Sequence, residues 1–388
     1  MGEADAQGDG GERLEEDWEL VQDLLPEGWQ AKARELGALR RGRGIADAAT
    51  LLRVMLIHLA QGCGLRETAV RAQEGGLARV SDVAILKRLR GCGEWFKWMA
   101  EGLRQKWLPE FPAAAATWQH RRVRLVDGTM VSEPGDTGSQ WRLHYAIGVP
   151  ALNCDEVILT GPREGETLKR FTVAGGDILI GDRGYAHPGG IASVVARGGD
   201  VIIRTNLVTL PLCDAGGARL DPLPYLRRLR VGQCGQWPVW VRADKRLLAG
   251  RLCAVKKSVA AAQRARQRVL RESQRGGHRV RPETLEAAEY VFVFTTLAEE
   301  VAAPVVMELY RGRWQIELAF KRLKSLVQLG HLKKHDPLAA CAWLQGKLLV
   351  AFLLDALLET AERISPWGYR WRGEPPPPLP LARDLVHA

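Results

Sequence analysis

The sequence has no CxxC pair, no long apolar run and no excess of acidic residues. Its seven cysteines are scattered, so neither a zinc site nor a disulfide framework is expected, and a reducing cytosol is the simplest location. Residues 1–17 are acidic and rich in glycine, unlike a signal or transit peptide, and are expected to be disordered. The most apolar run, Leu348–Leu358, is too short to span a bilayer and contains Asp355. We therefore expect a cytoplasmic protein with no membrane partner.

Positive charge is what the sequence has in excess. Its 55 Lys and Arg residues outnumber 45 Asp and Glu residues, which gives a net charge of +10 and a pI of about 9.4. A basic chain favours a polyanionic partner and fits nucleic acid, although many basic proteins bind none. With 46% hydrophobic residues, 388 residues are enough to bury a large core in two or three domains.

Residues 18–118 show a helical pattern, and residues 65–90 have the outline of a helix-turn-helix. A helix at Leu65–Gln73 is followed by a Gly-Gly turn and a second helix at Asp82–Arg90, for which Ser81 fits an N-cap. The second helix is expected to bury an apolar side, formed by Val83, Ile85, Leu86 and Leu89. Its outer face presents three cations to DNA: Lys87, Arg88 and Arg90. An ordinary helical bundle with a charged surface would show the same pattern, so both interpretations stay open.

From residue 119 the pattern changes to strands. Apolar runs predict strands at 123–131, 141–149, 156–161, 177–186 and 200–206, with helices beginning near 161–171 and 187–198. A further strand at 290–297 precedes one long helix at 301–328. We therefore predict an α/β fold with a mixed-sheet core at 119–206 and 290–337, interrupted by a mainly β insertion at 207–289. A C-terminal helix and a Pro-rich tail are expected at 338–388.

The insertion contains a strongly basic stretch. Ala260–Arg281 includes seven arginines. A solvated helix face and a surface that follows a phosphate backbone explain this composition equally well, and the sequence leaves both open.

Two aspartates end apolar runs of the predicted sheet. Asp127 follows VRLV and precedes Gly-Thr, and Asp182 follows DILIG and precedes Arg-Gly-Tyr. A carboxylate at the end of a buried strand lies at the sheet edge, where α/β proteins form their clefts. Taken singly, each residue also fits a turn-forming Asp. The functional interpretation therefore depends on a third carboxylate elsewhere in the sequence.

That third carboxylate is Glu317, in the helical stretch ELYRGRWQIELAFKRLKS. Helical spacing places a phenol and three cations on the face of Glu317: Tyr310, Arg313, Lys321 and Lys324. A solvated salt-bridge ladder has similar spacing. Three convergent carboxylates, however, repel one another unless a divalent cation neutralises them, and two Mg²⁺ ions about 4 Å apart would serve in-line attack on phosphorus.

Tyr310, Arg313, Glu317 and Lys324 match the pattern Y-x2-R-x3-E-x6-K, and with Asp127 in LVDGT and Asp182 in IGDRGYA the chain resembles the DDE transposases of the insertion sequence four family. Transposon-five transposase is the best-known relative. The resemblance extends over nearly all of residues 121–335. It implies an RNase H-like core in which Asp127, Asp182 and Glu317 are catalytic and bind two Mg²⁺ ions, with Mn²⁺ as a substitute.

The resemblance also implies partners and further site residues. The partners are double-stranded DNA at transposon ends and targets, and a second copy of the chain in the DNA complex. The resemblance implies DNA contacts by Tyr310, Arg313 and Lys324. Apart from the resemblance, Lys321 and Arg183 are further expected DNA contacts. In the relative, a Trp before the preceding strand stacks on a flipped base; this chain has no Trp there, which leaves Tyr290 and Phe292 as candidates.

Three functions fit these features. The leading one is a cut-and-paste transposase that binds terminal inverted repeats. An RNase H-like nuclease selective for DNA structure would share the carboxylates without joining strands. A silenced transposase would bind DNA as a regulator without cutting it.

Overall fold

The computed structural model describes residues 17–40, 42, 44–107, 121–132, 140–161, 163–330, 332 and 336–364. The predictions for residues 1–16, for the linker at 112–117 and for the Pro-rich tail lie outside these residues. The chain divides into two compact units. We call them the helical unit (Met1–Pro109, Met130–Trp141 and Ala319–Glu374) and the sheet unit (Glu110–Thr129, Arg142–Leu318 and Pro375–Ala388).

The helical unit is built around one long C-terminal helix, α13 (Pro337–Ile364). Against it pack α3 (Ala48–Ala60), α5 (Asp82–Gly91) and α6 (Gly93–Trp107), and the unit also contains α2 (Trp29–Glu35) and α4 (Leu65–Glu74). By length and composition α13 could cross a membrane at Pro337–Ala361, but 67% of its most apolar window is buried within the protein. A core helix of this unit accounts for that composition.

The two helices of the expected helix-turn-helix form where the sequence predicts them. α4 and α5 are joined by a turn in which Gly76 has a φ of +65°, a conformation that favours glycine. The Ser81 hydroxyl accepts the Ala84 N–H at 3.3 Å and so caps α5. Ile85 and Leu89 are fully buried as expected. The prediction for Val83 is wrong, because its side chain is 56% exposed: it lies in the first turn of α5, outside the buried stripe.

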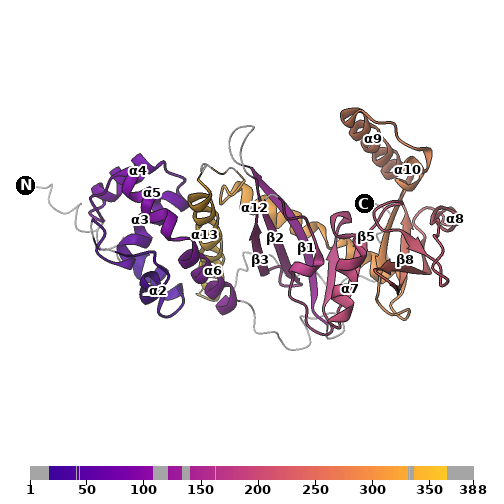
Figure 1. The fold of residues 1–388 in the computed structure, drawn as a ribbon, viewed down its shortest axis with the longest axis horizontal. Coiled ribbons are helices and arrows are strands. Elements are labelled where there is room, and N and C mark those ends of the chain that lie inside the picture. The colour runs from indigo at the N-terminus through magenta and orange to yellow at the C-terminus, as the bar shows by residue number, and fades with distance from the viewer. Residues whose placement is uncertain are drawn as a thin grey trace, which may run out of the picture. The chain divides into compact units, whose positions relative to one another are not determined.

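The sheet unit contains a nine-stranded mixed sheet with the strand order β3-β2-β1-β4-β5-β9-β8-β7-β6 (Figure 1). The strands are β1 (Val123–Ser132), β2 (Gln140–Val149), β3 (Cys154–Thr160), β4 (Ile178–Gly181), β5 (Asp200–Arg204), β6 (Leu212–Cys213), β7 (Cys234–Ala243), β8 (Arg246–Lys256) and β9 (Tyr290–Thr295). β1, β4 and β5 are parallel, and β9 is antiparallel to β5 and β8. The mixed α/β fold is therefore confirmed.

The strands of the insertion extend the core sheet. Its β7 and β8 form a hairpin of ten and eleven residues, and β9 joins that hairpin to β5, so that one continuous sheet results. The basic stretch forms α9 (Val259–Gly276), followed by α10 (Pro282–Ala287). In α9 only Ser273 is buried, so its arginines face solvent.

Helices cover the sheet. α7 (Pro188–Ala196) packs against β5 and β7, and α11 (Ala303–Arg311) packs against β5, β7 and β8. Strand side chains alternate between the two faces. Val126 belongs to the same buried cluster as the apolar side chains of α7, whereas Leu125 and Asp127 point to the opposite face.

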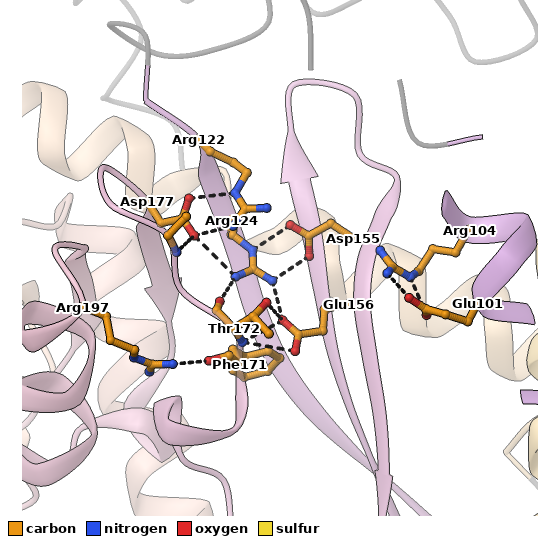
Figure 2. Close-up of polar contacts among 11 residues, drawn as sticks. Glu101, Arg104, Arg122, Arg124, Asp155, Glu156, Phe171, Thr172, Asp177 and Arg197 are labelled. Atoms are coloured by element: carbon orange, nitrogen blue, oxygen red, sulfur yellow. Dashed lines mark hydrogen bonds and ion pairs between the residues drawn. The ribbon is translucent and has the colours of Figure 1, made fainter. Parts of the chain in front are cut away.

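A buried ion network fixes the start of β1 to its neighbours (Figure 2). Arg124 is 1% exposed and donates to Asp155 on β3 at 2.7 and 3.0 Å and to Glu156 at 2.7 Å. Its Nη1 lies 3.7 Å from Asp177, which precedes β4 and pairs with Arg122. The two strands that lead to Asp127 and Asp182 are thus tied together beneath the site.

Two helix predictions need correction. The helix expected at 301–328 is two helices, α11 and α12 (Trp314–Ser325), because the backbone bonds at Arg313 and Ile316 close on the third preceding residue instead of the fourth. The helix expected to begin in 161–171 is only the short 3₁₀ turn η2 (Leu168–Arg170).

Candidate active site

Asp127 and Asp182 are neighbours on adjacent parallel strands. Residues 123–125 of β1 pair with residues 178–180 of β4 in constant register. The same register continued by two residues places Asp127, midway along β1, beside Asp182, which directly follows β4. Each aspartate accepts one backbone N–H at 2.8 Å, from Gly128 and Gly184 respectively. The structure therefore brings two of the three predicted carboxylates together.

The environment of Asp127 disfavours its negative charge. Burial raises the pKa of Asp127 to about 7, against the lowering effect of the Gly128 N–H. The charges of Asp182 and Glu166 raise it further, and Arg313 opposes them. A carboxyl group with this pKa gains from a cation placed beside it.

Arg313 connects Asp127 to Glu317. Its Nη1 lies 3.5 Å from Asp127 Oδ2, and its Nη2 donates to Glu317 Oε1. All three side chains belong to the sheet unit. Glu317 lies in the first turn of α12 and its side chain is 59% exposed. The guanidinium thus lies between the third predicted carboxylate and the first.

The donor set fits a hard divalent cation, although the side chains are not yet gathered around one. Carboxylate oxygens are the ligands that Mg²⁺ prefers. Within the described ranges, no three His, Cys, Asp or Glu side chains converge on a common metal position. Arg313 occupies the place between Asp127 and Glu317, so a cation would have to displace it from Asp127 for Glu317 to join the aspartates.

The predicted DNA-binding residues of α11 and α12 occupy different environments. Tyr310 is 8% exposed and its hydroxyl is buried without a hydrogen-bond partner among the described residues, so it does not share the solvent face of Glu317. Lys321 and Lys324 are exposed. Lys324 also lines a cavity of about 340 Å³ in the helical unit. The helix break at Arg313 explains why Tyr310 departs from the expected face.

Arg183 is exposed and belongs to a group of cations in the sheet unit. Burial and three neighbouring charges lower the pKa of Lys257 to about 8, the charges being those of Arg204, Arg183 and Arg268. Lys257 Nζ donates to the Ala288 carbonyl at 2.7 Å. Such a concentration of like charge beside Asp182 is suited to phosphate oxygens.

On α5, the three predicted cations lie toward one side but differ in their contacts. Lys87 and Arg90 are exposed and Arg88 is half-buried. Arg90 donates to Asp336 at 2.9 Å within the helical unit. Part of the charge on this helix is therefore already paired.

The two base-stacking candidates need correction. Tyr290 and Phe292 are 3% and 4% exposed and belong to the core cluster of the sheet, so neither is available to stack on a base. Trp314, directly after Arg313, is 48% exposed. Trp314 was not among the residues predicted for the site, although it lies inside the signature.

Glu166 is a further carboxylate near the site that the sequence pattern does not indicate. The charge of Glu166 raises the pKa of Asp127, and the charge of Asp182 raises the pKa of Glu166. The loop that carries it has no strand or helix period, so only the fold reveals its position.

Known proteins resemble the chain over most of its length. Residues 162–353 match the family described as "Transposase DDE domain". The chain is 40% identical over 341 residues to "Putative transposase InsL for insertion sequence element IS186A" of Escherichia coli (strain K12), which covers 86% of this chain and 91% of that protein. It is 40% identical over 342 residues to the transposase for insertion sequence element IS421 of Escherichia coli, with the same coverage. It is 28% identical over 279 residues to the transposase for IS231F of Bacillus thuringiensis subsp. israelensis, covering 61% and 57% of the two chains.

Proposed function

The chain belongs to the DDE transposases of the insertion sequence four type, and we propose that Asp127, Asp182 and Glu317 are its catalytic triad. It is a DNA transposase and has the RNase H-like fold that the DDE domain implies. Its relatives favour this function over a structure-selective nuclease and over a silenced regulator. The observation that supports the triad best is the β1–β4 register beside Asp127 and Asp182, with Arg313 joining Asp127 to Glu317.

The DDE domain implies use of a divalent metal ion, generally Mg²⁺. We propose two ions per site, with Mn²⁺ as a substitute, held by Asp127, Asp182 and Glu317. When bound, the ions activate the attacking water or 3′-hydroxyl and stabilise the leaving oxygen of the phosphodiester. Asp127 and Asp182 provide the half of the site that stands on paired strands. Glu317 completes it once Arg313 leaves Asp127 and becomes available to a phosphate of the DNA.

The cations proposed to contact the DNA backbone belong to two elements. Lys321 and Lys324 extend from α12, and Arg183 extends from the turn after β4. Each cation that meets a phosphate releases counterions, so binding should weaken steeply with salt. Trp314, exposed beside Arg313, replaces Tyr290 and Phe292 as the side chain proposed to stack on an unpaired base.

Recognition of the terminal inverted repeats is assigned to α4 and α5. Lys87, Arg88 and Arg90 are the proposed contacts, with α5 as the helix that enters the major groove. Two copies of the chain would bridge the two ends in a cut-and-paste route. The protein would act in the cytoplasm, associated with the nucleoid when bound to DNA.

The triad is tested by cleavage and joining of DNA that carries the element's ends, in Mg²⁺ and in Mn²⁺. Asp127→Asn, Asp182→Asn and Glu317→Gln should each lower the rate by about 10³-fold or more, because the groups act as a unit. Glu299→Gln, an exposed carboxylate after β9, is the matched control and should cut at the wild-type rate. Cleavage by Asp127→Asn at the rate of this control would refute the assignment.

A further inference from the structure

The carboxylate of Glu166 lies against the backbone directly after each of the two aspartates. A Cβ atom on Gly128 would lie 2.8 Å from Glu166 Oε1, and a Cβ atom on Gly184 would overlap Glu166 Oε2. These are the glycines whose N–H groups bind Asp127 and Asp182. Because both positions are glycines, no side chain there competes with the Glu166 carboxylate for space.

A buried hydroxyl group points to the same place. Tyr185 is fully buried, and its hydroxyl has no hydrogen-bond partner in the part of the chain that the structure describes. Burial raises the pKa of Tyr185, and Glu166, Asp127 and Asp182 raise it further in that order. The phenol therefore leaves a buried donor unused in the turn that follows Asp182.

The ion pair that Glu166 makes is a loose one. Arg142 Nη1 is 3.8 Å from Glu166 Oε1, which is too long for a hydrogen bond. Three carboxylates held together in this way favour binding of a divalent cation.

We propose that Glu166 is a fourth carboxylate of the active site and ligates the divalent cation together with Asp127 and Asp182. The proposal rests on the assignment of these two aspartates above. The cation has to draw the three side chains inward, since they do not yet converge on one position among the described residues. Gly128 and Gly184 leave the room for that movement.

Direct binding of Mn²⁺ to the full-length protein without DNA tests the proposal, with free Mn²⁺ measured by electron paramagnetic resonance. Glu166→Gln should lower the affinity about 10–100-fold, as loss of a group that supports a metal site does. Glu164→Gln is the matched control. Glu164 is in the same loop, is 54% exposed and pairs with Arg170 at 2.6 Å, so its variant should bind Mn²⁺ within about twofold of wild type.

A second pair of variants keeps every carboxylate. Gly184→Ala places a methyl group where Glu166 Oε2 lies, so it should displace Glu166 and reproduce the loss of affinity. Gly165→Ala has open space around its Cβ and should bind Mn²⁺ like wild type. Circular dichroism melting curves identify any variant that is unfolded at the assay temperature. If either Gly184→Ala or Glu166→Gln is unfolded, the other variant tests the proposal.

The outcomes separate this proposal from the triad. If Asp127→Asn and Asp182→Asn weaken Mn²⁺ binding while Glu166→Gln and Gly184→Ala bind like wild type, Glu166 merely pairs with Arg142 and the proposal is wrong. If neither aspartate variant weakens binding, the triad assignment itself fails. Loss of affinity in Glu166→Gln and Gly184→Ala, with Glu164→Gln and Gly165→Ala unaffected, is the result we expect.

Discussion

Replacing Arg124 with methionine should destabilise the sheet unit by about 3–5 kcal/mol, the cost of removing one partner from a buried ion network. Methionine fills much of the same volume, so the cost comes mainly from charge. The side chains of Asp155 and Asp177 are 5% and 3% exposed. Asp155 would lose both of its hydrogen bonds to Arg124 and stay buried, whereas Asp177 would keep Arg122.

The effect of the carboxylates on Arg124 supports this magnitude. Burial lowers the pKa of the Arg124 guanidinium, but the hydrogen bonds and charges of Asp155 and then Glu156 outweigh burial and raise it. The folded protein therefore favours the charged form strongly, and the carboxylates depend on it in turn. Arg124→Lys should lose less than Arg124→Met, because it keeps the charge without the forked geometry.

Urea denaturation measures the effect. With an m-value of about 3 kcal/mol per M, the midpoint should fall by about 1–1.7 M. Hydrogen exchange at β1 and β4 shows that the sheet unit, and not the helical unit, has lost stability. Arg170→Met removes the more exposed pair with Glu164 and should cost less than about 1 kcal/mol. A loss for Arg124→Met as small as that of Arg170→Met would refute the reasoning.

Four further predictions concern titration and the site. Burial lowers the pKa of His144 to about 4, so folding loses on the order of 3 kcal/mol as the pH falls from about 6.5 to 4; His144→Phe should remove this part of the pH dependence in urea titrations. Lys257 has a pKa of about 8 and must be charged to hold phosphate, so DNA affinity should fall by up to about tenfold per pH unit above pH 8, and Lys257→Gln should lack this slope in fluorescence anisotropy. Trp314→Ala should weaken binding to DNA with unpaired bases by about 1–3 kcal/mol, whereas equal loss on fully paired DNA would argue against stacking. Arg313→Gln should raise Mn²⁺ affinity about three- to tenfold, since a cation beside Asp127 is removed, and lower affinity would show that Arg313 orders the carboxylates instead.

Local patterns were sufficient to predict the elements that carry the site. Apolar runs located β1 and β4, and their ends placed Asp127 and Asp182 at the same sheet edge. Ser81 and the Gly-Gly turn located the ends of α4 and α5. These signals are local because they depend on strand and helix periods and on caps.

What the sequence could not provide depends on pairing between distant segments. Nothing local to β9 reveals that it lies between β5 and β8, and that position is what buries Tyr290 and Phe292. Likewise, one helical period runs through residues 301–328, so the break near Arg313 has no periodic signature. The position of Glu166 follows from loop packing against two glycines, which no period encodes.

The two halves of the site differ in how firmly the fold holds them. On one side, Arg124 ties the strands of Asp127 and Asp182 together from the opposite face of the sheet, so the backbone that carries these carboxylates is held before any ligand arrives. On the other side, Glu317 is largely exposed and is held through Arg313. Because Arg313 also contacts Asp127, a cation that binds the aspartates competes with this guanidinium, and the same event releases Glu317 and Arg313. Metal binding and phosphate binding are therefore coupled through one side chain, which favours a site that becomes complete only when both ligands are present.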